Sequence, residues 1–292
     1  MIPAAFDYHR PVSLDDAVKL LAQYGDEARV VAGGHSLIPM MKLRLAQPSH
    51  LVDLQDIGSL RGIKDAGAAF EIGAMTTQRE IILSKELAAA LPILKETAEQ
   101  IADPQVRSCG TLGGNVANGD PGNDMPAVMM ALDAVYLAKG ASGTREIKAR
   151  GFYQGAYATE LKDGEILTAI RIPKPPAGHG SAYVKQKRKI GDYATAAAAV
   201  ILTVSGGKCS AAAIALTNLG DTAILAEAAA QALIGSALDA ATIAKAAQAA
   251  VQAAQPAPKD ARGPADFRKS VAGVMTRRAI EAAAKRAGQG QA

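Results

Sequence analysis

The sequence of 292 residues contains no tryptophan, and aromatic residues make up only 4% of it. A hydrophobic core must therefore be built from alanine, leucine, isoleucine and valine. The two cysteines, Cys109 and Cys209, are far apart, and no C-x-x-C spacing occurs. This argues against a disulfide scaffold and, within the chain, against an all-cysteine iron–sulfur cluster or structural zinc site. It also favours a reducing compartment.

Several motifs that carry known chemistry are also missing. No G-x-G-x-x-G follows a predicted strand, Gly207-Lys208 lacks the upstream glycine of a P-loop, and no G-x-S-x-G elbow occurs. The four histidines show no H-x-x-x-H spacing, which gives a catalytic zinc site little support. The sequence therefore predicts no metal site and no catalytic residue in this chain.

Charge and apolar runs argue against two further classes of protein. The net charge is only +4, and acidic and basic residues are mixed except at 185–189 and 277–278. We interpret both basic runs as solvated surface, with a local anion site or a partner contact as the alternative. The longest apolar stretch, 194–204, is too short to span a membrane, and the first residues do not resemble a signal peptide. We expect no nucleic acid partner, no transmembrane segment and a cytoplasmic location.

The length predicts two domains, since one domain typically has about 150 residues. In the first, Ser13 is expected to cap a helix whose apolar stripe ends at Gly25. Further on we expect strands at 29–31, 50–54, 70–72, 134–138 and 166–172, helices at 78–83 and 85–102 with Pro92 opening a new segment, and a long loop at 103–123.

A dense run of proline and glycine at 173–180 predicts a linker between the domains. Beyond it we expect strands at 181–189, 194–204 and 208–217, with a hairpin turn at 205–207. From residue 221 the chain is rich in alanine. Spaced larger apolar residues there favour packed helices over disorder, in three pieces broken near Gly235 and at 255–258.

Two glycine pairs are the strongest local signal for chemistry: Ala32-Gly33-Gly34-His35-Ser36 and Thr111-Leu112-Gly113-Gly114-Asn115. Each pair lets the backbone approach a ligand, and successive N–H groups form a concavity that suits phosphate oxygens. Ser36, Thr111 and Asn115 add side-chain donors. Together the two loops predict a diphosphate site, with His35 as a residue that braces its loop.

These loops and their surroundings resemble the medium, FAD-binding subunit of the molybdenum hydroxylases over essentially the whole chain. The most specific segments are 32–38, 101–105, 111–115, 118–126 and 187–193. The last two are most similar to the carbon monoxide dehydrogenase branch of that family. The sequence departs from common family patterns at His35, where many relatives have glutamine, and at Leu112, where isoleucine is frequent. The branch that acts on 4-hydroxybenzoyl-CoA has a cysteine-bearing insertion, so two isolated cysteines disfavour it.

The resemblance implies an α+β fold. Residues 1–177 would form a FAD-binding domain of the PCMH or vanillyl-alcohol-oxidase type, with two α/β subdomains at about 1–55 and 56–177. Residues 178–292 would form a C-terminal domain of the carbon monoxide dehydrogenase flavoprotein type. In it a three-stranded antiparallel sheet and a helical bundle would cover the flavin ring.

The resemblance also implies a set of FAD contacts. The glycine loops would hold the pyrophosphate, and Asp124 would bind the ribose or adenine end, with a plain helix cap as the alternative. Ile101, Lys185 and Tyr193 would lie near the isoalloxazine ring, with Asp192 orienting the same loop. For Tyr193 the alternative is an ordinary half-buried sheet residue. The expected cofactor-binding residues are Ala32, Gly33, Gly34, His35, Ser36, Leu37, Ile101, Thr111, Gly113, Gly114, Asn115, Asp124, Lys185, Asp192 and Tyr193.

As a member of that family the chain would be an oxidoreductase subunit whose FAD takes electrons from a partner. A large molybdopterin subunit would oxidise the substrate, and a small subunit with [2Fe–2S] clusters would relay electrons, in a dimer of heterotrimers. A quinone or another acceptor would receive them, with the complex in the cytoplasm or peripheral at the inner face of the membrane. Carbon monoxide is the expected substrate, with purines, N-heterocycles or aldehydes as alternatives. A stand-alone FAD oxidoreductase and a non-redox nucleotide-binding scaffold remain further possibilities.

Overall fold

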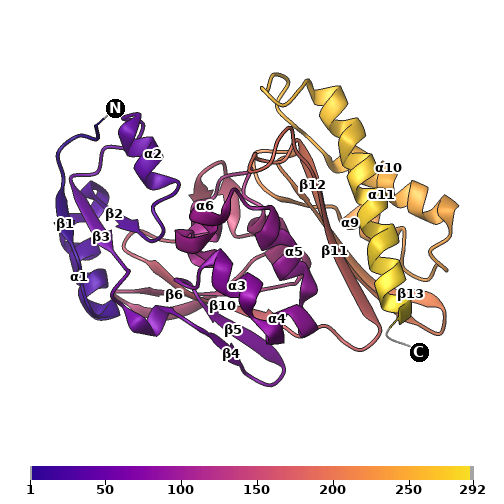
Figure 1. Cartoon of the computed structure of the whole chain (residues 1–292), viewed down its shortest axis with the longest axis horizontal. Coiled ribbons are helices and arrows are strands. Elements are labelled where there is room, and N and C mark those ends of the chain that lie inside the picture. Colours follow the sequence, from indigo (N-terminus) through magenta and orange to yellow (C-terminus); the bar gives the residue numbers. More distant parts are fainter. Residues whose placement is uncertain (1, 290–292) are drawn as a thin grey trace.

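The computed structural model describes residues 2–289 and is built on three main β-sheets that follow one another along the chain (Figure 1). The first sheet is parallel, in the order β1-β3-β2, and Ser13 caps the helix beside it by accepting a hydrogen bond from Asp16 N at 3.1 Å. The predicted helix start is therefore confirmed. The elements of this part are β1 (Asp7–His9), α1 (Leu14–Tyr24), β2 (Ala28–Val31), α2 (Leu37–Lys42) and β3 (His50–Asp53).

The second sheet is antiparallel and has the order β4-β5-β10-β6-β7. Pro92 opens α5 at its first turn, as predicted from the sequence. The strands are β4 (Ile63–Asp65), β5 (Ala69–Gly73), β6 (Val135–Gly140), β7 (Gly143–Lys148) and β10 (Ile166–Pro173), with a small ribbon of β8 (Tyr153–Gly155) and β9 (Ala158–Thr159). The helices are α3 (Gln78–Leu83), α4 (Lys85–Ala90), α5 (Pro92–Gln100), α6 (Pro104–Cys109), α7 (Leu112–Ala117) and α8 (Met125–Ala131).

The long loop expected at 103–123 is wrong, because α6 and α7 both lie within it. The Asp103 carboxylate accepts from Val106 N at 2.9 Å, and the Thr111 hydroxyl accepts from Gly114 N at 3.0 Å. Each helix thus begins at a side-chain cap. The second glycine pair therefore lies in the first turn of a helix.

The third sheet is antiparallel, in the order β11-β12-β13-β14. Its three long strands match the prediction, and the two-residue β14 is an addition to it. Helices follow, with breaks near Gly235 and at 255–258 as expected. The elements are β11 (His179–Gln186), β12 (Ala196–Ser205), β13 (Lys208–Thr217), β14 (Ile224–Leu225), α9 (Glu227–Gln231), α10 (Ala240–Ala253) and α11 (Ala265–Gln289).

Alanines of β12 connect the two halves of the protein. Ala197 and Ala199 belong to the core that contains α8, whereas Ala196 and Ala198 face the core under α11. This alternation is the two-residue period of a strand that is buried on both faces. Small side chains there let helices approach the sheet from both sides. One core therefore runs from the second sheet into the third.

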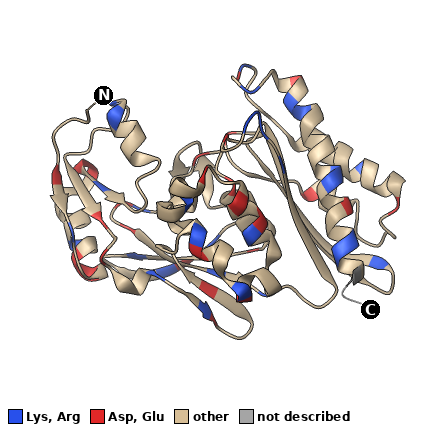
Figure 2. Ribbon diagram, in the orientation of Figure 1, with Lys and Arg blue, Asp and Glu red and all other residues tan. Residues whose placement is uncertain are grey.

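The segment between Pro173 and His179 joins the second sheet to the third. A domain boundary at 177/178 stays a prediction, and so do the subdomains at 1–55 and 56–177. Helix α1 packs with Ile57, Leu60 and Ile166 in one cluster, so contacts cross the proposed subdomain boundary. Figure 2 shows acidic and basic residues interspersed over much of the ribbon. Within residues 2–289, the helices are all too short or too polar to cross a bilayer.

Gly180 tests the close packing of α11 on the third sheet. A Cβ at this position would run into the backbone of Ala283 and lie 2.6 Å from Ala287 N. We expect Gly180→Ala to lower the free energy of unfolding by about 1–3 kcal/mol through overpacking. Urea denaturation measures this, with Gly155→Ala as the control because its nearest neighbour would be 3.9 Å away. Equal stability of the two variants would contradict the packing described.

Candidate functional site

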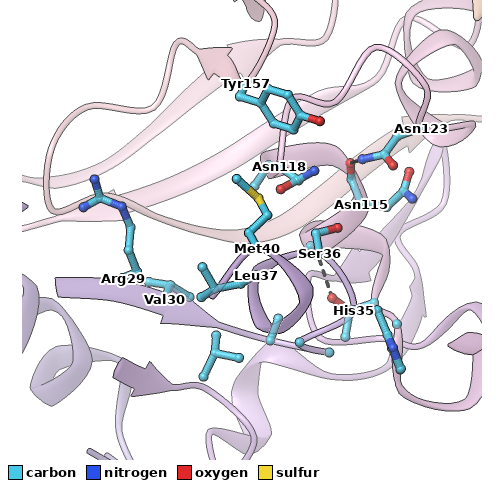
Figure 3. Close-up of a pocket in the computed structure, with 18 of the residues that line it drawn as sticks. Arg29, Val30, His35, Ser36, Leu37, Met40, Asn115, Asn118, Asn123 and Tyr157 are labelled. Atoms are coloured by element: carbon cyan, nitrogen blue, oxygen red, sulfur yellow. Dashed lines mark hydrogen bonds between the residues drawn. The ribbon is translucent and has the colours of Figure 1, made fainter. Parts of the chain in front are cut away.

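A cleft of about 800 Å³ is lined by residues of the first sheet, of helices and loops beside the second sheet and of the third sheet, and its size suits a small-molecule cofactor. The β2–α2 loop, the α6–α7 turn and the segment from Asn118 to Asp124 form much of its wall. The C-terminal part adds Lys185 and residues 191–193. In Figure 3, Arg29 and Val30 lie on one side, whereas Ser36, Asn115 and Asn123 gather on the other.

The two glycine segments touch each other beside this cleft. A Cβ on Gly33 would run into the carbonyl of Cys109 and lie 2.7 Å from Gly110 Cα. A Cβ on Gly114 would lie 3.6 Å from the Cβ of Ala32. Gly33 is therefore required where one piece of backbone crosses another. The two loops form a single wall, as the diphosphate hypothesis requires.

The first glycine loop offers free backbone donors. Gly34 has φ +73°, and its carbonyl accepts from Ile38 N at 3.0 Å. Within residues 2–289, the amides of Gly33 to Leu37 donate no hydrogen bond. Consecutive unpaired N–H groups suit an anion such as a phosphate. This loop matches the predicted cradle.

The second glycine segment does not match it. Leu112 N donates to Thr76 O at 2.9 Å, Gly113 N to Ala74 O at 2.8 Å, and Gly114 N to its own cap. The prediction that amides of both loops bind the anion is therefore wrong for this segment. It presents side chains instead, because its amides already donate to the segment between β5 and α3 and to its own helix cap.

The predicted cofactor-binding residues line the cleft with the exception of Gly113. A Cβ on Gly113 would lie 2.7 Å from Ala74 O, so this glycine allows α7 to pack on the second sheet. His35 also differs from its prediction. Its side chain is exposed and makes no hydrogen bond to any residue in the described range 2–289, so it does not brace the loop.

Asp124 forms a buried ion pair with Lys185 across the interface between the two halves. The Lys185 Nζ donates to the carboxylate at 2.8 Å, and the Tyr183 hydroxyl donates to it at 2.5 Å. The side chains of Asp124 and Lys185 are only 5% and 1% exposed. Asp124 makes no capping bond to α8, so the helix-cap alternative is wrong. The solvated-surface interpretation of 185–189 is likewise wrong for Lys185.

This contact also corrects the predicted FAD contacts. Asp124 was expected at the ribose or adenine end of the cofactor and Lys185 near the isoalloxazine ring. Since their charged atoms lie 2.8 Å apart, they mark the same part of the cleft. The two expected positions at separate ends of one extended dinucleotide are therefore incompatible.

Burial raises the pKa of the Asp124 carboxyl above its ordinary value, although Lys185 and Tyr183 both act in the opposite direction. Burial and the neighbouring Asp124 charge raise the pKa of Tyr183 well above its ordinary value. Tyr183 therefore stays neutral and keeps donating to the carboxylate at physiological pH. Burial and the nearby Lys185 lower the pKa of Lys187.

Tyr193 and Asp192 lie in the loop between β11 and β12, so the sheet-residue alternative for Tyr193 is wrong. A Cβ on Gly122 would lie 2.7 Å from the Tyr193 ring, and the Arg262 guanidinium sits 5.4 Å from the ring centroid. The Asp192 carboxylate binds Arg188 Nε at 2.8 Å. Burial raises the pKa of that carboxyl, but Arg188, the Tyr193 amide and Arg262 together outweigh burial, so the pKa is lowered. These contacts fix the loop beside the cleft.

Several residues that line the cleft were not predicted: Arg29, Met40, Gln78, Asn118, Asn123 and Tyr157. Two of them carry buried side-chain atoms with no partner in the described part of the chain: Nδ2 of Asn118, and both Nε2 and Oε1 of Gln78. Buried polar atoms are normally hydrogen-bonded. Together with the free amides they fit a polar ligand with phosphate and hydroxyl groups, such as FAD. Asn118 and Asn123 lie in segment 118–126, whereas nothing in the sequence marked Gln78.

Comparison with known proteins agrees with this site. Residues 4–175 match the family described as the FAD binding domain in molybdopterin dehydrogenase. Residues 181–283 match the CO dehydrogenase flavoprotein C-terminal domain. Fold and site together define a FAD-binding flavoprotein subunit. The chain belongs to the family of FAD-binding medium subunits of the molybdenum hydroxylases, and so is an oxidoreductase subunit.

Relatives match the chain over nearly its whole length. The carbon monoxide dehydrogenase medium chain of Afipia carboxidovorans is 60% identical over 98% of this chain and 99% of its own, and that of Hydrogenophaga pseudoflava is 47% identical over 97% and 98%. The structure of reconstituted CO dehydrogenase from Oligotropha carboxidovorans superposes with a TM-score of 0.96 at 60% identity, covering 98% of this chain and 100% of that one. Quinoline 2-oxidoreductase from Pseudomonas putida 86 gives 0.92 at 36% identity, with 100% of both chains covered.

Gly33 tests the single wall formed by the two glycine segments. Gly33→Ala places a Cβ against the Cys109–Gly110 backbone and must push the segments apart. We expect the variant to lose most of its FAD, measured as the flavin-to-protein ratio after purification. Gly58→Ala is the control, because its Cβ would meet no atom within 4 Å. Full FAD occupancy in Gly33→Ala would show that the diphosphate lies elsewhere.

Lys185 tests the electrostatics of the buried pair. Lys185→Met leaves Asp124 without its cation, which we expect to cost about 3–5 kcal/mol of unfolding free energy at neutral pH. The already raised pKa of Asp124 should rise further. The deficit is the loss of unfolding free energy relative to the unaltered protein. It therefore shrinks as pH falls through that pKa and the carboxyl gains a proton, and it grows as pH rises.

Urea denaturation of the flavin-free protein at pH 5 and pH 8 measures this dependence. The double variant Asp124→Asn/Lys185→Met is the control: it lacks the titrating carboxyl, so its unfolding free energy should not show the fall between pH 5 and pH 8 that the unpaired carboxylate causes in Lys185→Met. A Lys185→Met deficit of equal size at both pH values would rule out the unpaired carboxylate as its cause.

Proposed function

We propose that this chain is the electron-transferring FAD subunit of a molybdenum-containing carbon monoxide dehydrogenase. The observation that carries the proposal is 60% identity to a carbon monoxide dehydrogenase medium chain over 98% of this chain. A relative with a different substrate, a 6-hydroxypseudooxynicotine dehydrogenase subunit from Paenarthrobacter nicotinovorans, is 38% identical. The higher identity to the carbon monoxide dehydrogenase chain favours carbon monoxide as the substrate over purines, N-heterocycles and aldehydes.

Each group of residues has a role in holding the cofactor. The free amides of Gly33 to Leu37 would bind the diphosphate, with the Asn118 amide as a further donor. The Lys185–Asp124 pair and Tyr193 would lie at the isoalloxazine end, where the C-terminal part closes the cleft. When bound, FAD supplies a centre that accepts electrons from one partner and passes them to another. The protein contributes binding, orientation and a fixed ion pair beside the ring.

The proposal includes partner subunits that hold the other redox centres. A large molybdopterin subunit would oxidise carbon monoxide with water to carbon dioxide, releasing two protons and two electrons. A small subunit with [2Fe–2S] clusters would carry the electrons to the FAD, in a dimer of heterotrimers. A quinone or another acceptor would then receive them. Location in the cytoplasm, with peripheral attachment to the inner face of the membrane through the complex, stays a prediction.

Reduction of the flavin separates this function from its alternatives. Under anaerobic conditions we expect carbon monoxide to bleach the visible flavin absorbance only when the chain is assembled with its large and small subunits. Xanthine and quinoline are the control substrates and should leave the flavin oxidised. Reduction of the isolated chain by NADPH would indicate a stand-alone oxidoreductase instead, and failure to bind FAD in the assembled complex would indicate a non-redox scaffold.

A further inference from the structure

Gln78 is a buried residue whose carboxamide has no hydrogen-bond partner in the part of the chain that the structure describes. It is 1% exposed, and neither Nε2 nor Oε1 makes a hydrogen bond within residues 2–289. Leaving a buried donor and a buried acceptor unpaired costs free energy that an apolar side chain of similar shape would not cost. Gln78 is also among the residues that line the cleft, so a ligand there would lie next to it. The residue is thus suited to binding rather than to folding.

The backbone of Gln78 is held firmly in place. Thr77 and Glu80 form a reciprocal capping box at the start of α3. Gln78 N donates to Gly110 O at 2.9 Å, and Leu112 N donates to Thr76 O at 2.9 Å. The start of α3 is therefore attached directly to the α6–α7 turn. The backbone of Gln78 is consequently held at a fixed point of the cleft wall.

That point lies toward the side of the cleft that the C-terminal part closes. Helix α3 packs against α5 and α6, and Ile101, just beyond α5, lines the cleft together with Gln78. Lys185 Nζ approaches Gln100 O, the residue before Ile101, at 3.4 Å. Helix α3, which begins at Gln78, and Lys185 therefore both contact α5, and Lys185 lies where the isoalloxazine end is proposed to be.

The two unpaired atoms define the chemistry of the ligand group. Phosphate oxygens only accept hydrogen bonds, so a diphosphate can satisfy Nε2 but not Oε1. A group with a donor beside an acceptor satisfies both. Resting on the FAD function proposed above, we infer that the Gln78 carboxamide binds the flavin-bearing half of FAD through such a group. Two groups there have this chemistry: a ribityl hydroxyl, and the imide edge of the isoalloxazine ring.

The test uses the complex purified from its host through a tag on this chain, depleted of flavin and titrated with FAD. Gln78→Met keeps the length of the side chain and removes both hydrogen-bonding atoms. We expect its Kd for FAD to rise about tenfold or more, the equivalent of about 1.4 kcal/mol. The Kd for ADP, which lacks the flavin half, should stay unchanged. Gln231→Met, at an exposed position on α9, is the matched control for both ligands.

Further measurements separate an effect on binding from an effect on folding. They also distinguish the two candidate groups, the ribityl hydroxyl and the imide edge. Because the lost atoms are unpaired in the protein itself, the thermal midpoint of the flavin-free variant should not fall. A shifted flavin absorption spectrum and reduction potential would identify the imide edge, since its hydrogen bonds act on the chromophore. Weaker binding with an unchanged spectrum would identify the ribityl hydroxyl.

Three results would overturn the inference. Gln78→Met could bind FAD as tightly as the unaltered protein, its affinity for ADP could fall as much as that for FAD, or its flavin-free form could unfold at a lower temperature with FAD affinity intact. Each of these leaves the proposed function standing, because the unaltered complex still binds FAD. If the unaltered complex binds no FAD, the proposed function fails as well.

Discussion

The buried contact of Asp124 with Lys185 and Tyr183 joins the two halves of the protein. The carboxylate precedes α8 in the FAD-binding part, and both of its partners lie on β11 of the C-terminal part. A charge pair removed from water is stable only when each member keeps its partner. Any movement that opened the cleft at this point would separate the pair. The pair therefore helps the shared core to hold the two halves together at the wall of the cleft.

Much of the fold could be predicted from local chemistry. Ser13 caps a helix, Pro92 sets the backbone geometry of a helix start, and the alanine-rich C-terminal segment has a high helix propensity. Each effect acts within a few residues, so the sequence pattern alone predicts these helices. Helices α6 and α7 were missed because glycine, asparagine and proline dominate segment 103–123. The caps Asp103 and Thr111 were visible signals, but short helices depend on tertiary contacts such as Leu112 N to Thr76 O.

The candidate site, too, depends on tertiary contacts that a local sequence pattern does not show. The free amides of the first glycine loop follow from its position after a strand, and they match the prediction. Asp124 and Lys185 are 61 residues apart, so no local pattern reveals that they touch. Gln78 occupies an ordinary position at the start of a helix. Only the fold shows that its carboxamide is buried, that the residue lines the cleft and that the carboxamide has no hydrogen-bond partner within residues 2–289.

The alternating alanines of β12 have a consequence for how such a protein can evolve. Since one face of this strand completes the core of the FAD-binding part and the other completes the C-terminal core, neither half has a finished surface of its own. A gene split at the proline-rich linker would encode two fragments, each of which would expose a large apolar surface. Selection must therefore act on both halves as one heritable unit, even though two separate family signatures describe them.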